Sequence, residues 1–290
     1  MIFVAIELSS LATYILTAFA KRRQTALEGG MKYFMLGIFA SAILVYGMGW
    51  VYGLTGSTNL TAISQALQNS VVGQDRLDPA LVLALLLVIV GLGFKMAAVP
   101  FHFWTPDAYD GAATPVTAYM SVIPKVAAFA ATIRILVQAL GPVADNWVNV
   151  MAVLALVTMV FGNVVAISQR NVKRMLAYSS IAHAGYVLVG VVATLRAGDD
   201  AQGSILFYLL TYTVSTVGAF GALIWCGSRG AEAVSYEDLA GVGKRHPAAG
   251  LAFSLFLLSL AGVPPTAGFF GKLYIVKSAI GAGLNTLAIV

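Results

Sequence analysis

The sequence predicts an all-α, polytopic membrane protein, and its composition and apolar segments support that class. Of its 290 residues, 59% are hydrophobic and only 10% are charged, and the mean hydropathy is +0.87. This composition offers too little polar surface to cover a water-soluble globule. Apolar stretches of about 20 residues recur along the chain, which is the length a helix needs to cross about 30 Å of hydrocarbon, and none alternates like a barrel strand.

The apolar stretches place the expected membrane-spanning helices. They run at about residues 1–20, 31–54, 80–113, 116–138, 146–167, 175–195, 202–226 and 248–281, with a ninth beginning near 282. Alternate loops fall on alternate faces, and one face then receives Lys21, Arg22, Arg23, Arg170, Lys173, Arg174, Arg229, Lys244 and Arg245. The other face receives only Arg76 and Arg196. The basic face is therefore expected to be cytoplasmic.

The remaining polar residues do not indicate a metal or nucleotide site. The single Cys226 excludes a disulfide framework and a cysteine-ligated centre within this sequence, and His102, His183 and His246 are scattered without ligand spacing. No glycine-rich phosphate loop follows a strand. Loop orientation explains the formal charge of +5 better than nucleic-acid binding does, given the hydropathy.

Two of the expected spans, 80–113 and 248–281, are too long for one crossing. Each has about 34 residues, or about 50 Å as a straight helix, against a hydrocarbon core of about 30 Å. They contain the proline-bearing sequences AAVPFHFWTPD and AGVPPTAGFFG. Because proline removes a backbone donor and clashes with the preceding turn, we expect both helices to be broken near the middle of the membrane, as in many ion pathways.

The two broken spans are third and eighth in order, so they cross the membrane in opposite directions. That spacing predicts inverted repeats of five helices, although proline and glycine are also commoner in membrane helices generally. Residues 1–138 would be part of the first repeat, without its N-terminal helices, and residues 146–290 the second, without its C-terminal helices. Because the sequence starts and stops inside apolar runs, we expect an internal piece of a longer protein.

Four ionisable residues, Glu7, Lys95, Lys125 and Lys272, fall inside the expected spans. Counting at 1.5 Å per residue places Lys95 about 20 Å from one end of its span and Lys125 about 15 Å from the other end of the next. A charge at that depth costs from about 3 to over 10 kcal/mol. One glutamate cannot neutralise three lysines, so we expect a row of groups that exchange protons near neutral pH, which is a proton relay.

A structural explanation remains for these charges, namely a buried ion pair or lysines that extend to the interface. It suits Lys277, Arg134 and Lys32, which lie near span ends. His183, in SSIAHAGYVLVG, is a candidate relay residue because imidazole titrates near neutrality, or else a hydrogen-bonded structural residue. For His102, inside the first break, we expect a structural role in which it bonds the unpaired carbonyls.

Three segments carry a family resemblance. GFKMAAVPFHFWTPDAYDGAATPVTAYMS, NVKRMLAYSSIAHAGYVL and LSLAGVPPTAGFFGKLYIV resemble the antiporter-like membrane subunits of respiratory complex I. PFHFWTPDAY is shared across the superfamily, including Mrp-type sodium/proton antiporters. GFK, the PK of the next helix and FFGK favour the N-subunit family of bacterial NADH:quinone oxidoreductase over its L and M relatives. The M relatives carry a glutamate in place of the last lysine.

The resemblance assigns roles to the charged residues. It implies that Glu7 and Lys95 form an acid–base pair, that Lys125 links the halves and that Lys272 is the terminal group of the second half, while Lys32 matches a further family lysine. It also implies a bacterial inner-membrane translocase subunit without a cofactor of its own, and with neighbouring antiporter-like and small membrane subunits as partners. NADH, FMN, iron–sulfur clusters and quinone would belong to those other subunits.

Two other functions remain open from the sequence. One is an Mrp-type cation antiporter that uses the same lysines for exchange. The other is a scaffold bundle whose ion pairs are purely structural. A neighbouring gene for a quinone- or NADH-binding subunit would favour the complex I function, and sodium-dependent exchange would favour the antiporter.

Overall fold

The computed structural model describes residues 1–71, 78–227 and 232–289, so Arg76 and Arg229 lie outside the described residues. Within these ranges the chain forms helices and one isolated β-bridge, which confirms the all-α class. The longer helices are α1 (Ile2–Thr17), α2 (Gln24–Thr55), α3 (Leu60–Val71), α4 (Pro79–Met96), α5 (Trp104–Gly111), α6 (Thr114–Thr132), α7 (Ala144–Ile167), α8 (Val172–Cys226), α11 (Pro247–Ala261) and α12 (Ala267–Gly281). The shorter ones are η1 (Ile133–Ala139), η2 (Gly141–Val143), α9 (Tyr236–Leu239), α10 (Val242–Arg245) and α13 (Asn285–Ile289).

The helices agree with most of the expected spans. In the described part of the chain, five helical stretches are long and apolar enough to cross a membrane. α2 begins at Gln24 rather than near residue 31, because hydropathy locates the apolar part of a helix and misses its polar first turn. α3 was not predicted as a helix. It buries Ile63 and Leu67, four residues apart on one face, while its other face is too polar for a span.

The long α8 covers two expected spans, 175–195 and 202–226. It consists of two helical arms that meet at a kink at Gly198, whose backbone (φ 54°, ψ −131°) is not helical. L residues with a Cβ rarely adopt that conformation. The two arms of α8 therefore correspond to the two expected helices, with the turn at the glycine.

We expect Gly198→Ala to destabilise the folded protein by about 1–3 kcal/mol, because alanine is strained at this positive φ. Gly203→Ala is the matched control. Gly203 is helical and a methyl group there would meet nothing within 4 Å, so it should be neutral or stabilise by up to about 1 kcal/mol. Thermal unfolding of the purified assembly measures both. Equal melting of the two variants would contradict the prediction.

Both long spans are interrupted in the structure. α4 ends at Met96 and α5 begins at Trp104, and α11 ends at Ala261 and α12 begins at Ala267. The residue after each first half, Ala97 (φ 60°) and Gly262 (φ 83°), is left-handed, which is a common helix terminator. The inverted symmetry of the two halves stays a prediction.

Side chains satisfy backbone groups at the first interruption. Trp104 Nε1 donates to Phe94 O at 3.1 Å, and Val99 N donates to Thr158 Oγ1 at 3.0 Å. The role expected of His102, bonding the unpaired carbonyls here, stays a prediction. Its ring packs against Phe103 and Phe161, each with ring centroids 4.7 Å away, and its buried Nδ1 has no hydrogen-bond partner among the described residues.

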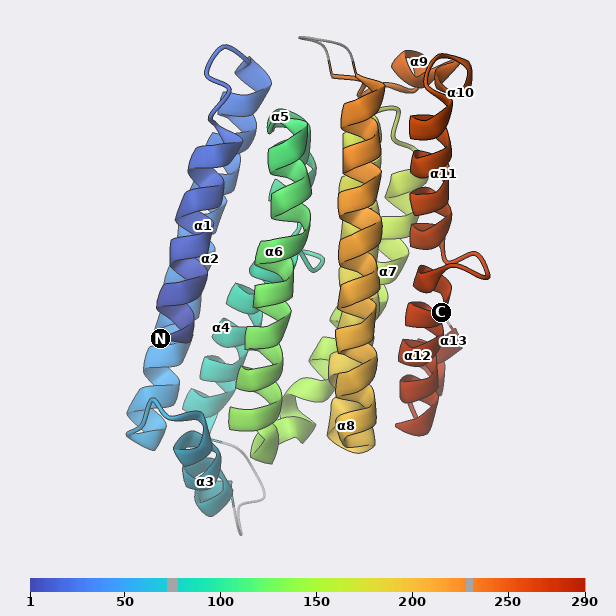
Figure 1. Cartoon of the computed structure of the whole chain (residues 1–290). Coiled ribbons are helices and arrows are strands. Elements are labelled where there is room, and N and C mark those ends of the chain that lie inside the picture. Colours follow the sequence, from blue (N-terminus) through green and yellow to red (C-terminus); the bar gives the residue numbers. More distant parts are fainter. Residues whose placement is uncertain (72–77, 228–231, 290) are drawn as a thin grey trace.

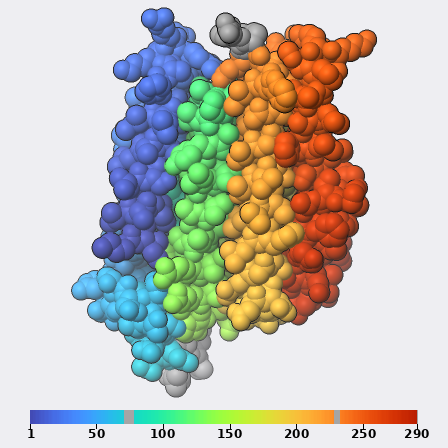
Figure 2. All heavy atoms as spheres, in the orientation of Figure 1, coloured from blue at the N-terminus to red at the C-terminus, as the bar shows by residue number. Residues whose placement is uncertain are grey.

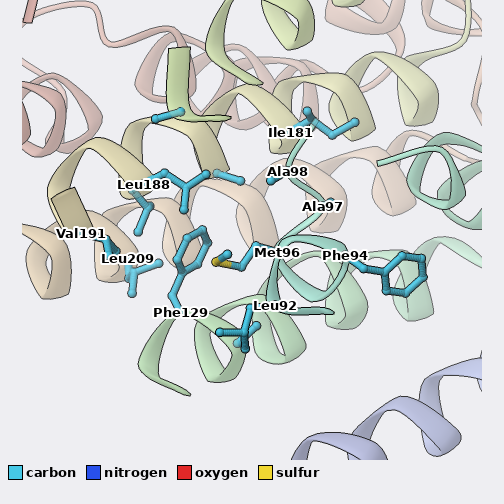
Figure 3. Packing of buried hydrophobic residues seen from close by; sticks show 14 of the residues in the cluster. Leu92, Phe94, Met96, Ala97, Ala98, Phe129, Ile181, Leu188, Val191 and Leu209 are labelled. Carbon is cyan, nitrogen blue, oxygen red and sulfur yellow. The ribbon is translucent and has the colours of Figure 1, made fainter. Parts of the chain in front are cut away.

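α8 holds the bundle together. It packs against α6 on one side and against α7, α11 and α12 on the other, while α2 packs against α1, α4 and α5. Figure 1 shows these helices running side by side, with α9 and α10 at one end of the bundle and α3 at the other. Met96 and Phe129 converge on Leu188 and Leu209 of α8 in the shared core (Figure 3).

The outer faces of the bundle are apolar, as a lipid-facing surface requires. In α7 the exposed side chains include Val153, Val157, Val160 and Val164, which recur every three or four residues and so form one stripe. The second arm of α8 and α11–α12 adjoin across the face seen in Figure 2.

Candidate functional site

Lys95 and Glu7 form a buried ion pair inside the first half of the bundle. Lys95 Nζ lies 2.8 Å from Glu7 Oε1 and donates to Ser10 Oγ at 2.9 Å and Ser41 Oγ at 3.2 Å. The ammonium thus has two hydroxyl acceptors and one carboxylate as its counter-charge. Lys95 also stands in the last turn of α4, where the negative end of the helix dipole stabilises a cation. The predicted acid–base pair is thus brought together.

Lys125 lies between the two halves. Its side chain is buried, with 2% exposed, and its Nζ donates to Ser180 O at 3.2 Å and to Ser180 Oγ. The Nζ also lies 5.7 Å from the centre of the Tyr109 ring. Within the described residues no carboxylate lies within ion-pair distance of it. Its charge therefore depends on hydroxyl, carbonyl and aromatic groups alone.

Ser180 fixes the direction of a hydrogen-bond chain that starts at Lys125. Tyr212 OH donates to Ser121 O at 3.1 Å, so it accepts from Ser180 Oγ, 2.7 Å away. Ser180 Oγ has one proton, which it gives to Tyr212, and it therefore accepts from Lys125. The chain runs from ammonium to serine to tyrosine. Removal of a proton from Lys125 would allow the whole chain to reverse.

His183 extends the row of buried titratable residues, Glu7, Lys95 and Lys125, toward the second half of the bundle. Its ring is buried and its Nδ1 is hydrogen-bonded to Tyr208 OH. The ring centroid is 5.1 Å from that of Tyr212 and 5.9 Å from that of Tyr186. The Tyr186 ring in turn lies 4.9 Å from Lys272 Nζ. His183 therefore stands between Lys125 and Lys272.

Lys272 is half-buried and lies at the second interruption. Its Nζ donates to Ala261 O at 3.0 Å, the last residue of the half-helix α11. Like Lys95, it stands at the negative end of a half-helix. The two are held differently, however, because Lys95 precedes its break on the same half-helix, whereas Lys272 reaches back across its break from α12.

Three small cavities lie beside the buried titratable groups. The first, about 20 Å³, is lined by both Lys95 and Lys125, which is room for about one water. The second, about 10 Å³, is lined by Lys125 and His183. The third, also about 10 Å³, is lined by His183, Tyr212 and Ser259. The predicted buried residues thus form one line through the bundle.

Lys32 lies apart from this line. Its ammonium pairs with Glu28 Oε1 at 2.6 Å and Asp107 Oδ2 at 2.8 Å, and its side chain is 46% exposed. Lys32 stands nine residues before Ser41 on α2, which is about 13 Å along the helix axis. Its assignment as a relay residue stays a prediction, and its contacts are those of a residue at the end of the bundle.

The sequence did not point to the hydroxyl groups that connect the lysines. These are Ser10, Ser41, Tyr109, Ser180, Tyr208 and Tyr212. Serine in a membrane helix commonly bonds its own backbone, so composition alone does not separate a connecting serine from an ordinary one. The segment AYSSIAH places two serines close to a histidine, and this proximity is the available sequence signal for a connecting hydroxyl. In the described part of the chain no group of three metal-ligating side chains occurs.

Comparison with known proteins decides the family. The family model described as "NADH:quinone oxidoreductase/Mrp antiporter, TM" matches residues 1–290. The chain belongs to this family. Among its curated relatives, "NADH-quinone oxidoreductase subunit N 1" of Sorangium cellulosum is 60% identical over 294 residues, covering 99% of this chain and 58% of that protein. The chain therefore spans somewhat more than half the length of this relative.

Solved structures of the NADH:quinone oxidoreductase/Mrp antiporter family share the fold. A chain of respiratory complex I from Thermus thermophilus matches with a TM-score of 0.80 and 41% identity, covering 99% of this chain and 60% of that one. A chain of the Mrp complex from Dietzia matches with a TM-score of 0.81 but 27% identity, covering 99% of this chain and 52% of that one. Both branches of the family thus have this arrangement of helices.

Proposed function

We propose that this chain is the proton-conducting part of an N-type membrane subunit of a bacterial NADH:quinone oxidoreductase. The observation that supports it best is the line from Glu7 through Lys95, Lys125 and His183 to Lys272. Small cavities lie between Lys95 and Lys125 and between Lys125 and His183, and the Tyr186 ring lies between His183 and Lys272. Lys95 and Lys272 each lie at an interrupted helix. Soluble or purely structural bundles have no need for three buried amines with a single carboxylate among them.

The proposed relay works by changing charges in sequence. When Glu7 moves away from Lys95 or takes up a proton, the Lys95 ammonium loses its counter-charge and can give its proton to the cavity shared with Lys125. A charge that arrives near Lys125 repels the proton held there, and Lys125 gives that proton to His183 across the cavity that both line. The Ser180 and Tyr212 hydroxyls can then turn their protons toward the neutral Lys125 amine. His183 then passes the change toward Lys272. Each step is a proton transfer whose energy depends on its neighbours, as in coupled titration.

The relatives support the remaining parts of the proposal. Proteins named NADH-quinone oxidoreductase subunit N match at up to 60% identity in the comparisons above, so we propose the bacterial inner membrane as the location. The partners would be neighbouring antiporter-like and small membrane subunits of complex I. NADH, FMN, iron–sulfur clusters and quinone would act in other subunits, and this chain would be a translocase part without redox catalysis. Residues 1–138 and 146–290 would be portions of two inverted repeats, with the basic end cytoplasmic.

An Mrp-type antiporter is the less supported alternative. The Dietzia Mrp chain is 27% identical, against 41% for the Thermus complex I chain. Both use the same fold, so the fold does not separate them. Sodium-dependent proton exchange by the full protein in vesicles, independent of quinone reduction, would favour the antiporter.

Replacing Lys95 or Lys272 by alanine in the assembled oxidoreductase tests the proposed function. We expect quinone-coupled proton pumping to fall at least tenfold in each variant, since each removes a proton-carrying group that its neighbours cannot replace. Pumping and quinone reduction are measured together in vesicles. An assembled variant that turns over normally and pumps at the parental ratio would show that the relay assignment is wrong.

A further inference from the structure

Glu232 joins three separate parts of the chain at one end of the bundle. Its Oε2 lies 2.9 Å from Arg23 Nη1, in the α1–α2 connection, and 3.5 Å from Lys173 Nζ, at the start of α8. Its Oε1 accepts a hydrogen bond from Thr114 N at 2.8 Å, at the start of α6. One carboxylate therefore contacts both halves of the bundle.

Lys173 completes the connection from the α8 side. Its side chain is fully buried, and its ammonium donates to Asp110 O at 3.1 Å and to Ala112 O. These carbonyls lie at the end of α5 and just before α6, so Lys173 stabilises the C-terminal end of α5. A buried ammonium in this position needs a nearby negative charge, and Glu232 supplies it.

The backbone around Glu232 is itself anchored to α8. Val172 N donates to Val234 O at 2.8 Å, and Asn171 forms an antiparallel bridge with Ser235. Ser235 and Asp238 then form a capping box at the start of α9. The carboxylate of Glu232 is thus presented from a fixed segment toward α6, whose N-terminus has no side-chain cap within its own helix.

The contacts of Glu232 with Thr114 and Lys173 lie at the starts of α6 and α8. These two helices also carry the contact between Lys125 and Ser180. Lys125 follows Thr114 by 11 residues, about 16 Å along α6, and Ser180 follows Lys173 by seven, about 10 Å along α8. Both helices start at the same end of the bundle, so a contact between their starts sets how far one is displaced along the other. A displacement of one residue rise, about 1.5 Å, would break the Lys125–Ser180 hydrogen bonds.

We propose that Glu232 is a positioning residue for the proton relay, whose carboxylate holds the start of α6 against the start of α8 and so sets the contact between Lys125 and Ser180. The inference rests on the proposed function. Glu232 does not carry the transported proton, because it lies at the end of the bundle, and it acts through the two helices. Neither the family resemblance nor the relay geometry assigns this role to a residue of the 232–235 segment.

The Glu232 carboxylate stays ionised throughout the pH range of turnover. Burial raises the pKa of Glu232, but the Thr114 N–H, the Lys173 charge and the Arg23 guanidinium outweigh burial and hold the pKa at about 2. A lowered folded-state pKa means that the stabilisation is complete above the ordinary value of 4.5 and is lost as pH falls through about 2. A change in the pH profile of a Glu232 variant near neutrality would therefore report on the relay, not on Glu232 itself.

The test uses Glu232→Ala and Glu232→Asp in the assembled oxidoreductase, with Glu237→Ala as the matched control. Glu237 is an exposed glutamate of α9, five residues along the chain. We expect Glu232→Ala to lower coupled pumping roughly tenfold, since small misplacements of reacting groups cost this much or more, and to displace the pH profile of pumping. Glu232→Asp should restore part of the rate, and Glu237→Ala should match the parent.

The outcomes separate this inference from the proposed function when Lys125→Met is measured in parallel. If only Lys125→Met loses pumping and Glu232→Ala keeps the parental rate and pH profile, the positioning role is wrong and the relay stands. If Lys125→Met pumps normally, the relay is wrong. If both Glu232 variants fail to assemble while Glu237→Ala assembles, the carboxylate is a folding requirement, which overturns the positioning role.

Discussion

Replacing Lys125 by methionine should abolish most of the proton pumping of the assembled complex, with a loss of more than tenfold, while assembly is retained. Lys125 lines both the cavity it shares with Lys95 and the cavity it shares with His183. Methionine keeps most of the apolar stem but has no proton to carry. Removing a buried ammonium that has no carboxylate partner among the described residues also removes its desolvation cost, so stability should be unchanged or increased.

Lys277→Met is the matched control for this prediction. Lys277 is also a lysine of a membrane helix, but its side chain is exposed on α12 and none of the three cavities contains it. We expect parental pumping from this variant. Proton uptake per quinone reduced, measured in vesicles across pH 6 to 8, compares the two. Equal pumping ratios for Lys125→Met and Lys277→Met would mean that Lys125 is structural.

The fold was largely predictable because hydrocarbon imposes a length and a composition on every helix that crosses it. The spans, their proline interruptions and the grouping of basic residues all follow from that requirement. The end of the bundle that carries α9 and α10 holds three of the grouped basic residues, Arg23, Lys173 and Arg245. Two departures have local causes. α3 is amphipathic and too short for the length rule, and the two arms of α8 follow each other with only the kink at Gly198 between them.

The site was only half predictable. The energetic cost of a buried charge made Lys95, Lys125 and Lys272 conspicuous in the sequence, and Glu7 with them. The hydroxyls of Ser180 and of the surrounding tyrosines cost little in a membrane helix, so the sequence gives at most the proximity of Ser180 to His183 and not the contacts that the packed helices make. Their roles depend on tertiary distances, such as the 2.7 Å between Ser180 Oγ and Tyr212 OH.

Glu232 illustrates the same limit outside the membrane. In the sequence it stands in a polar connection, where glutamate is ordinary, and the basic residues near it serve as orientation signals. Only the folded chain brings Arg23, Thr114 and Lys173 around its carboxylate. Residues more than 100 positions apart along the chain contribute to this contact, and no local pattern records it.

The second large effect expected is on assembly, from Gly268→Ala at the start of α12. A Cβ at this position would overlap Ser259 O and lie 2.7 Å from its carbonyl carbon. Because the obstructing atoms belong to the backbone of α11, no side-chain rotation can make room, and α12 must move away from α11. Such overpacking costs about 1–3 kcal/mol or more. Gly281→Ala, in the same helix with nothing within 4 Å of the added methyl, is the control.

The movement forced by Gly268→Ala would also disturb the second interruption. Gly268 N donates to Ser259 Oγ at 3.2 Å, and Ser259 Oγ is 2.7 Å from Ser215 Oγ on α8. Displacing α12 therefore separates Lys272 from Ala261 O as well as weakening the packing. We expect a lower yield of assembled complex, a lower melting temperature and, in the complex that does assemble, reduced pumping. If Gly268→Ala assembles, melts and pumps like Gly281→Ala, then α11 and α12 are not held this closely at the break, and the half-helix end cannot be what positions Lys272.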